Sequence, residues 1–192
     1  MENMRITLKI YISIILISSI FITKIKICDA GCSWINRSKG LAGYKLTTIA
    51  VDKENPNIIY VGSKGLLFKT PDNGENWKSI FKVPGINKAV NFIAIDPKNP
   101  KAIYVATESG IFKSEDGGTN WQAIPLGAEE KNVLTLIIDP EDSNTLFAGT
   151  ERDIFISKDG GRNWMKSSEG LSEINIKSLA QNYIDKIGRA HV

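Results

Sequence analysis

An eight-residue signature occurs three times in this chain and constrains its fold more than any other feature. The copies at 70–77, 114–121 and 157–164 read TPDNGENW, SEDGGTNW and SKDGGRNW. Their tryptophans lie 44 and 43 residues apart. A repeat of this length is typical of folds in which each copy is one small sheet that must stack on its neighbours. The recurring residues are Thr70, Asp72, Gly74 and Trp77, then Ser114, Asp116, Gly118 and Trp121, then Ser157, Asp159, Gly161 and Trp164.

Each copy is expected to form four short strands. In the first copy, apolar and β-branched runs at 46–51, 58–62, 66–70 and 77–80 are separated by Gly, Pro, Asn and Asp. No part of the repeats keeps apolar residues at helical spacing for ten or more positions. The sequence therefore predicts an all-β chain of four-stranded antiparallel blades. Their expected bounds are about 46–81, 90–125 and 133–167, with the start of a further blade at 174–181.

The aspartates of the signature are interpreted as structural. A short Asp side chain in the hairpin between strands three and four can accept hydrogen bonds from turn amides, and the upstream hydroxyl can join it. Glycine permits a positive φ, and the tryptophan buries a large ring. A calcium loop is the alternative, but calcium takes about six to eight oxygen ligands and no suitably spaced glutamate follows. We expect neither a metal nor a cofactor.

The pattern Ser/Thr-x-Asp-x-Gly-x-x-Trp follows an Asp-Pro-x-x-Pro turn and an Ile-Tyr-Val strand, and it resembles the Asp-box, or bacterial neuraminidase (BNR), repeat. Over residues 34–180 this resemblance implies a β-propeller with about three complete blades and partial strands at both ends. Such repeats are found in sialidases, xyloglucan hydrolases, sortilin-type receptors and photosystem II assembly-factor-like proteins. The motif is specific for the blade and says little about activity.

Residues 1–30 are predicted to be a signal peptide. Arg5 and Lys9 precede an apolar run at 10–22, and small residues stand before Gly31. Thirteen helical residues span about 20 Å, less than the ~30 Å hydrocarbon core, so cleavage is favoured over an uncleaved anchor across 8–27. A lipoprotein reading of 30–32 is weaker because Asp29 stands where an aliphatic residue is expected. Each alternative places the repeats outside the cytoplasm, secreted or periplasmic.

Charge and cysteine content exclude several classes of function. The net charge of +3 falls to +1 without the leader, since residues 1–30 hold four basic and two acidic side chains. No basic stripe of the kind that binds nucleic acid remains, so no nucleic-acid partner is expected. After the leader, Cys32 alone supports neither a disulfide nor a zinc site.

The two ends suggest that the blades at 31–186 belong to a longer propeller. Trp34 lies 43 residues before Trp77 and is expected to begin the closing strand of another blade. Residues 187–192 resemble the translation of a sequencing adapter, so they are predicted to be a non-native tail, and His191 with them. The native gene is then expected to continue.

Candidate site residues lie in the turns between strands two and three, at the end of each blade opposite the Asp boxes. They are Lys64, Glu108, Glu151, Arg152 and Asp153. Glu108 and Glu151 could serve as a general acid and base across a sugar, but charged residues in tight turns are more often simply solvated. In the xyloglucan hydrolases that the chain resembles, the turn occupied here by Lys64 carries a catalytic Asp. Sialidases need three arginines, and outside leader and tail the chain has only Arg37, Arg152 and Arg162.

The favoured hypothesis is an extracytoplasmic propeller that binds or scaffolds a polysaccharide or a protein. A membrane would be involved only through an uncleaved leader. The alternative is the opening part of a secreted glycoside hydrolase, sialidase-like or xyloglucanase-like. A photosystem II assembly-factor-like role is a further alternative within the binding class.

Overall fold

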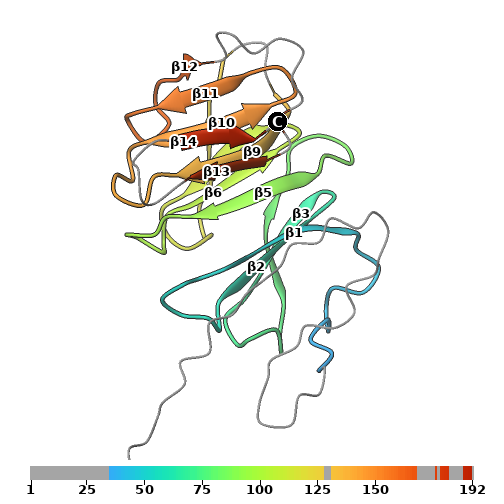
Figure 1. Cartoon of the computed structure of the whole chain (residues 1–192). Helices are drawn as coiled ribbons and strands as arrows, with labels where there is room; N and C mark the ends of the chain where they lie inside the picture. The colour runs from blue at the N-terminus through green and yellow to red at the C-terminus, as the bar shows by residue number, and fades with distance from the viewer. Residues whose placement is uncertain (1–34, 128–130, 168–175, 177, 182–187, 192) are drawn as a thin grey trace, which may run out of the picture.

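The computed structural model describes residues 35–127, 131–167, 176, 178–181 and 188–191. Every regular element within these ranges is a β-strand (Figure 1). Across the same ranges no helix is long and apolar enough to cross a membrane. The predicted signal peptide at 1–30 lies outside the described residues.

Three four-stranded antiparallel sheets make up the body of the molecule, each with its strands in chain order. The first contains β1 Leu46–Val51, β2 Ile59–Ser63, β3 Leu66–Thr70 and β4 Lys78–Lys82. The second contains β5 Val90–Ile95, β6 Ile103–Thr107, β7 Gly110–Ser114 and β8 Gln122–Ile124. The third contains β9 Val133–Ile138, β10 Leu146–Thr150, β11 Ile154–Ser157 and β12 Met165–Lys166. These sheets confirm the all-β prediction.

The sheets are arranged side by side with their first strands innermost. Strand β1 lies beside β5, and β5 lies beside β9 (Figure 1). Strand β13, Ser178–Gln181, continues the series beside β9. Successive meanders whose first strands adjoin are the arrangement of a partial β-propeller, so each sheet is called a blade from here on.

The tryptophan of each signature stands just before the last strand of its blade. The sequence predicts that this strand begins at the tryptophan, but β4, β8 and β12 each begin one residue later. The first ladder pair of the last strand in the first blade is Lys69 with Lys78. The backbone of each tryptophan therefore lies outside the ladder, and its indole N–H donates to a backbone carbonyl.

The predicted first strand of a further blade, 174–181, is only partly described. Strand β13 falls within it and pairs antiparallel with β14, Gly188–His191. Ile176 is buried with Ile154 and Leu179, and its amide donates to the carbonyl of Thr150 at 3.3 Å. Ile176, two residues before β13, is thus packed onto the third blade.

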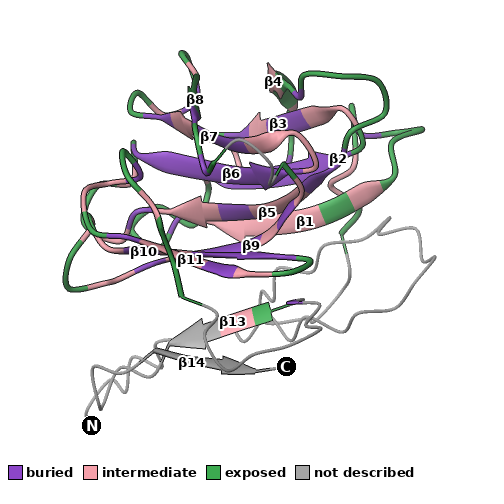
Figure 2. Ribbon diagram, turned by 90° about the horizontal axis from the view of Figure 1, so that it is seen from above, coloured by how far each residue is buried: buried purple, intermediate pink, exposed green. Residues whose placement is uncertain are grey.

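The core lies between the blades and is densest along the second strands. Every residue of β2 and β6 is buried (Figure 2), whereas both residues of the outer strand β12 are exposed. Tyr60 and Tyr104 keep only 1% and 2% of their surface exposed. Burial of these large rings between neighbouring sheets means that the blades hold one another together.

One position in the second strand must be small because the next blade approaches it closely. A Cβ on Gly62 would lie 2.6 Å from Val90 Cγ1, and one on Gly149 would lie 2.6 Å from Ile176 Cγ2. The second blade has Ala106 at the same place, fully buried. The close approach at this point fixes how tightly successive blades pack around the axis.

Candidate binding surface

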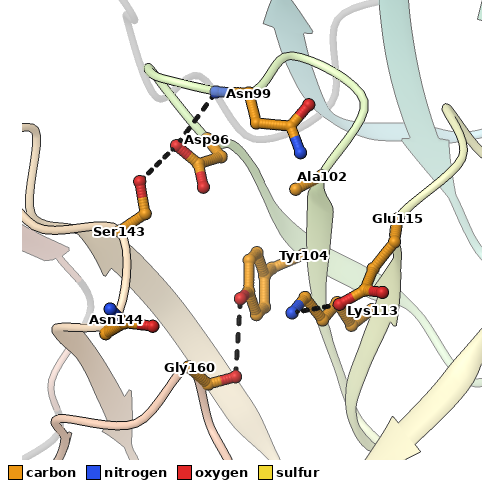
Figure 3. Close-up of a pocket in the computed structure, with 9 residues that line it drawn as sticks. All are labelled: Asp96, Asn99, Ala102, Tyr104, Lys113, Glu115, Ser143, Asn144 and Gly160. Carbon is orange, nitrogen blue, oxygen red and sulfur yellow. Dashed lines mark hydrogen bonds and ion pairs between the residues drawn. The ribbon is translucent and has the colours of Figure 1, made fainter.

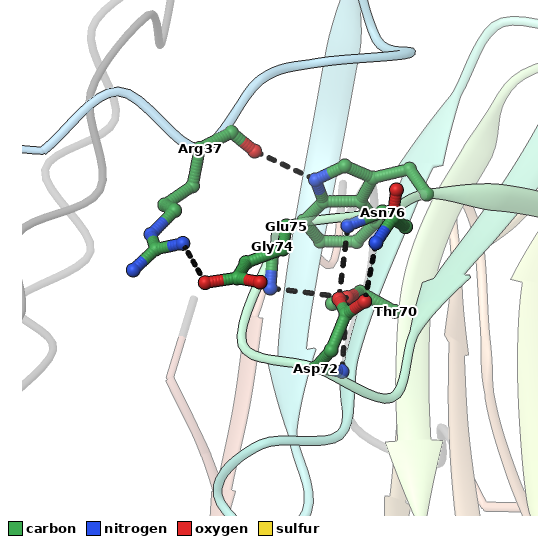
Figure 4. A network of polar contacts seen from close by, with 7 residues as sticks. Arg37, Thr70, Asp72, Gly74, Glu75 and Asn76 are labelled. Carbon is green, nitrogen blue, oxygen red and sulfur yellow. Dashed lines mark hydrogen bonds and ion pairs between the residues drawn. The ribbon is translucent and has the colours of Figure 1, made fainter.

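The first Asp box is a closed network of short hydrogen bonds (Figure 4). Thr70 Oγ1 donates to Asp72 Oδ1 at 2.6 Å and accepts from the amide of Gly74 at 3.0 Å. The other carboxylate contacts come from Asn76, whose amide reaches Oδ1 at 2.9 Å and whose Nδ2 reaches Oδ2 at 2.7 Å. All donors and acceptors of this network lie between residues 70 and 76, so the box is a local clip.

The second and third boxes repeat the same network. Ser114 and Ser157 replace Thr70, and Asn120 and Asn163 replace Asn76. Hydrogen bonds lower the pKa of all three aspartates to about 2: that of Asp72 mainly through the Thr70 hydroxyl, and those of Asp116 and Asp159 mainly through the amides of Asn120 and Asn163. These side chains remain ionised carboxylates whose oxygens are committed to the turn.

The turn of each box contains two consecutive residues with positive φ. Glycines fill both places in the second and third copies, and Asn73 with φ 60° precedes Gly74 with φ 85° in the first. Asparagine is among the few side chains that tolerate this region. The sequence prediction that glycine supplies a positive φ here is confirmed.

The tryptophans of the first two boxes tie each box to the chain that precedes its blade. Trp121 Nε1 donates to the carbonyls of Gly118 at 3.1 Å and Ile80 at 3.2 Å, and Trp77 Nε1 donates to the carbonyl of Arg37 at 2.7 Å. Arg37 therefore occupies, before the first blade, the place that Ile80 occupies before the second. Its guanidinium pairs with Glu75 at 2.6 Å (Figure 4).

The opposite end of the blades carries the candidate residues, and a second repeated clip supports it. Ser63, Thr107 and Thr150 end the second strands, are completely buried, and donate their hydroxyls to backbone carbonyls of the following turn. Sequence reasoning missed this clip. Its signal is a hydroxyl residue recurring at intervals of 44 and 43 directly after a small residue.

Glu108 and Glu151 occupy equivalent turns and both bond to the loop that precedes their own blade. Glu108 Oε2 accepts from the amide of Ala89 at 3.3 Å. Glu151 Oε1 accepts from Asn132 Nδ2 at 2.8 Å, and Asn132 Oδ1 accepts in turn from Asn91. Each carboxylate thus braces a loop of its own blade, and this is the structural role that competes with acid and base catalysis.

The remaining three candidates also lie in these turns. Lys64 is exposed and its backbone bridges to Ala89, which places it against the loop before the second blade. Arg152 is exposed, and its amide donates to Thr150 Oγ1 at 3.3 Å. Asp153 Oδ1 pairs with Lys166 Nζ at 2.7 Å. The turns of the first and third blades therefore present side chains of both charges.

The loop before the second blade projects an apolar side chain from the same end, and sequence reasoning did not single out this residue. Ile86 is 88% exposed, although the loop around it is braced: Ser109 Oγ donates to the carbonyl of Pro84 at 2.6 Å, and the amide of Gly65 donates to that of Lys88 at 2.8 Å. A large apolar side chain held in solvent by a fixed loop is a common anchor for a partner. No pattern in the sequence distinguishes it from a buried isoleucine.

We refer to this end as the loop surface, defined by the turns and loops around Lys64, Ile86, Glu108, Glu151 and Arg152. It can offer hydrogen-bonding carboxylates, basic groups and one apolar anchor. Among the described residues no group of three or more histidine, cysteine, aspartate or glutamate side chains is placed to hold a metal ion.

The blades, their Asp boxes and the adjoining first strands define a propeller protein of the Asp-box, or BNR, class. The family model described as photosynthesis system II assembly factor YCF48 matches residues 21–128, more than half of the chain. The chain belongs to this family. The resemblance stated from the sequence is thereby confirmed.

Solved structures share the fold. An ancestral GH74 enzyme is 26% identical over 62% of this chain and 18% of its own, with a TM-score of 0.54. A structure of YCF48 bound to D1 peptide is 15% identical to this chain, with a TM-score of 0.55. The match covers 73% of this chain and 44% of the YCF48 chain. The extracellular domain of BT4673 from B. thetaiotaomicron is 18% identical, with a TM-score of 0.59. The match covers 79% of this chain and 21% of the BT4673 chain.

The chain spans less than half the length of each of these three proteins. A search of the curated proteins found no match.

Proposed function

We propose that the chain is part of an extracytoplasmic Asp-box propeller that binds a protein segment on its loop surface, in the manner of an assembly factor. The observation that carries the proposal is the combination of Ile86, 88% exposed on a braced loop, with side chains of both charges in the neighbouring turns. An apolar anchor within a polar rim is the usual composition of a protein interface. The membership of the YCF48 family and the D1 peptide bound by the YCF48 neighbour support a peptide ligand.

The extracytoplasmic location is part of the same proposal. The leader at 1–30 is the main argument for it, and the neighbour BT4673 is an extracellular domain. Protein is preferred over polysaccharide because no described aromatic side chain of the loop surface offers a flat exposed ring, apart from Tyr44, which is 42% exposed and whose ring packs edge-on against Phe68.

A titration with D1 peptide tests the proposal. Ile86→Ser is expected to weaken binding roughly tenfold, because a central apolar anchor commonly contributes that much. Met165→Ser is the matched control, since Met165 is also exposed, at 58%, but lies on the outer strand β12. Equal affinities for both variants and the native chain, or no binding of the peptide, would contradict the proposed ligand surface.

A glycoside hydrolase is the second candidate, supported by the 26% identity to a GH74 enzyme and by the carboxylates of Glu108 and Glu151 at one end of adjacent blades. The hydrogen bonds that commit both groups to loop bracing count against it, as does Lys64 in the turn where the resembling hydrolases carry an aspartate. Release of reducing sugar from xyloglucan, lost in Glu108→Gln or Glu151→Gln, would reverse the preference.

A further inference from the structure

At the Asp-box end, the two successive joints between blades each contain a lysine and a tyrosine, but the two lysines have different hydrogen-bond partners. Between the first and second blades, Lys69 Nζ donates to the carbonyl of Gly117 at 2.8 Å. It also lies 5.3 Å from the ring centroid of Tyr60. The chain's own ammonium therefore occupies the space between a tyrosine ring and an Asp-box carbonyl.

At the joint between the second and third blades, the equivalent lysine lies over its tyrosine ring in the same way but has a different hydrogen-bond partner. Lys113 lies 5.2 Å from the ring centroid of Tyr104, but its Nζ pairs with Glu115 at 2.7 Å. The first copy has Pro71 where the second has Glu115, so Lys69 has no such competing partner. The Gly160 carbonyl, equivalent to that of Gly117, is instead reached by the Tyr104 hydroxyl, at 3.4 Å.

A cavity of about 350 Å³ lies where the second lysine does not reach (Figure 3). Its wall includes Asp96, Tyr104, Ser143, Asn144 and Gly160, with Lys113 and Glu115 along one side. Because Glu115 neutralises Lys113, the carboxylate of Asp96 is the uncompensated charge of the wall. The cavity is thus polar and carries one net negative charge.

Asp96 supplies a buried acceptor that points into this cavity. The residue is only 5% exposed, and its Oδ1 accepts from the amide of Lys98 at 2.8 Å, the amide of Asn99 at 3.3 Å and Ser143 Oγ at 2.7 Å. No donor in the described part of the chain reaches Oδ2, which points toward Tyr104 in Figure 3. Because this carboxylate oxygen faces the cavity and has no protein donor, it can accept a charge-assisted hydrogen bond from a cationic donor placed there.

We propose that this cavity binds the primary ammonium group of an alkylamine, such as a lysine side chain. The ammonium donates to Asp96 Oδ2 and to the Gly160 carbonyl, the acceptor equivalent to the one that Lys69 reaches in the neighbouring joint. The site lies at the Asp-box end, opposite the loop surface. It is therefore independent of the proposed function.

The binding test uses the full chain labelled with ¹⁵N and titrated with n-butylammonium chloride. The amide signals of Asn144 and Gly160 are expected to shift to saturation. The controls are n-butanol, which has the same chain length without charge, and potassium chloride at equal ionic strength. A response to either control as large as that to butylammonium would overturn the proposal, as would the absence of a saturable shift.

Two variants, Asp96→Asn and Glu115→Gln, test whether the ammonium binds in the cavity. Asp96→Asn is expected to weaken butylammonium binding at least about tenfold, because it removes a charge-assisted hydrogen bond. Asp52→Asn is the matched control: Asp52 caps the equivalent turn of the first blade through the amides of Glu54 and Asn55, and its removal should leave the affinity unchanged.

The second variant, Glu115→Gln, is expected to let the chain's own Lys113 occupy the ammonium site. Glu115 is exposed, so folding should be retained, and the released Lys113 is expected to reach the Gly160 carbonyl as Lys69 reaches that of Gly117. Butylammonium binding should fall roughly tenfold by this competition. An unchanged affinity in Glu115→Gln would overturn the proposal even if Asp96→Asn fails to fold.

The source of the amine is decided by a second ligand. Nα-acetyl-lysine amide binding more tightly than butylammonium would assign the cavity to lysine side chains of a peptide. Equal affinities would assign it to free alkylamines. Both results support recognition of a primary ammonium.

Discussion

The two ends of the blades differ in how closely they repeat. At the Asp-box end, three copies build the same hydrogen bonds with the same residue types, and all three aspartates have a pKa of about 2. At the loop end, equivalent turns carry Lys64, Glu108 and Glu151, and each turn is held by the same kind of bond from a buried hydroxyl to a backbone carbonyl. We therefore expect stability to depend mainly on the end that repeats, and the proposed recognition to depend on the end where a common scaffold presents different side chains.

The largest effect expected from this comparison comes from an Asp-box tryptophan. Trp121 packs 4.8 Å from the ring centroid of Phe81 and bonds to the carbonyls of Ile80 and Gly118, so Trp121→Ala should lower the free energy of unfolding by about 3 kcal/mol. Urea unfolding measures the change. Trp164→Ala serves as comparison and should cost less, because the described bond of its indole stays within its own turn, to Gly161. Equal losses would show that the contact between blades contributes little.

The hydroxyl of the box gives the next largest effect. Ser114 is 1% exposed and bonds both Asp116 and the amide of Gly118, so Ser114→Ala leaves a buried amide without an acceptor and should cost about 1–3 kcal/mol. Thermal unfolding checks this loss. Ser114→Thr is the matched control because Thr70 already makes the same bonds in the first blade. A loss as large in the threonine variant would point to packing instead of hydrogen bonding.

Acid should weaken the Asp-box end selectively. A folded pKa near 2, below the ordinary 3.8, means that the unfolded chain binds more protons between these values. Stability is therefore complete above about pH 4 and falls as the pH drops toward 2. Unfolding midpoints measured across this range test the sign. Replacing Asp116 by Asn should flatten the dependence, and a slope unchanged by this variant would remove the box from the explanation.

The smallest change in stability is expected at the loop end. Glu151→Ala removes one exposed bond to Asn132 and should alter the free energy of unfolding by no more than about 0.5 kcal/mol. The same variant should still change ligand binding if the loop surface is the binding face. A loss comparable to that of Ser114→Ala would erase the distinction between the two ends.

Much of the fold could be predicted from the sequence because the repeat makes its signals redundant. The spacing of Trp77, Trp121 and Trp164 places the hairpin between the third and fourth strands of each blade, and the glycines of the boxes identify the positive φ positions. The buried hydroxyls of Ser63, Thr107 and Thr150 escaped notice because a hydroxyl after a strand is common in any turn.

The cavity could not be predicted, because it depends on which hydrogen-bond acceptor Lys113 contacts. Lys69 and Lys113 occupy equivalent positions, and only Glu115, at a place within the box where the residue type varies, draws the second lysine aside. The exposed Ile86 was equally hidden, since exposure is decided by the bracing of Pro84 from the next blade.

The closure of each Asp box within a few consecutive residues also bears on the order of folding. Contacts between neighbours in sequence form with little loss of chain entropy, so these hairpins can be made before the sheets dock. A repeat whose hairpin is stabilised by its own residues can be duplicated in tandem, because the new copy needs no new hydrogen-bond partners from other parts of the chain. Growth of such a protein by whole copies of about 43 residues then requires only that each new sheet present a face its predecessor can cover.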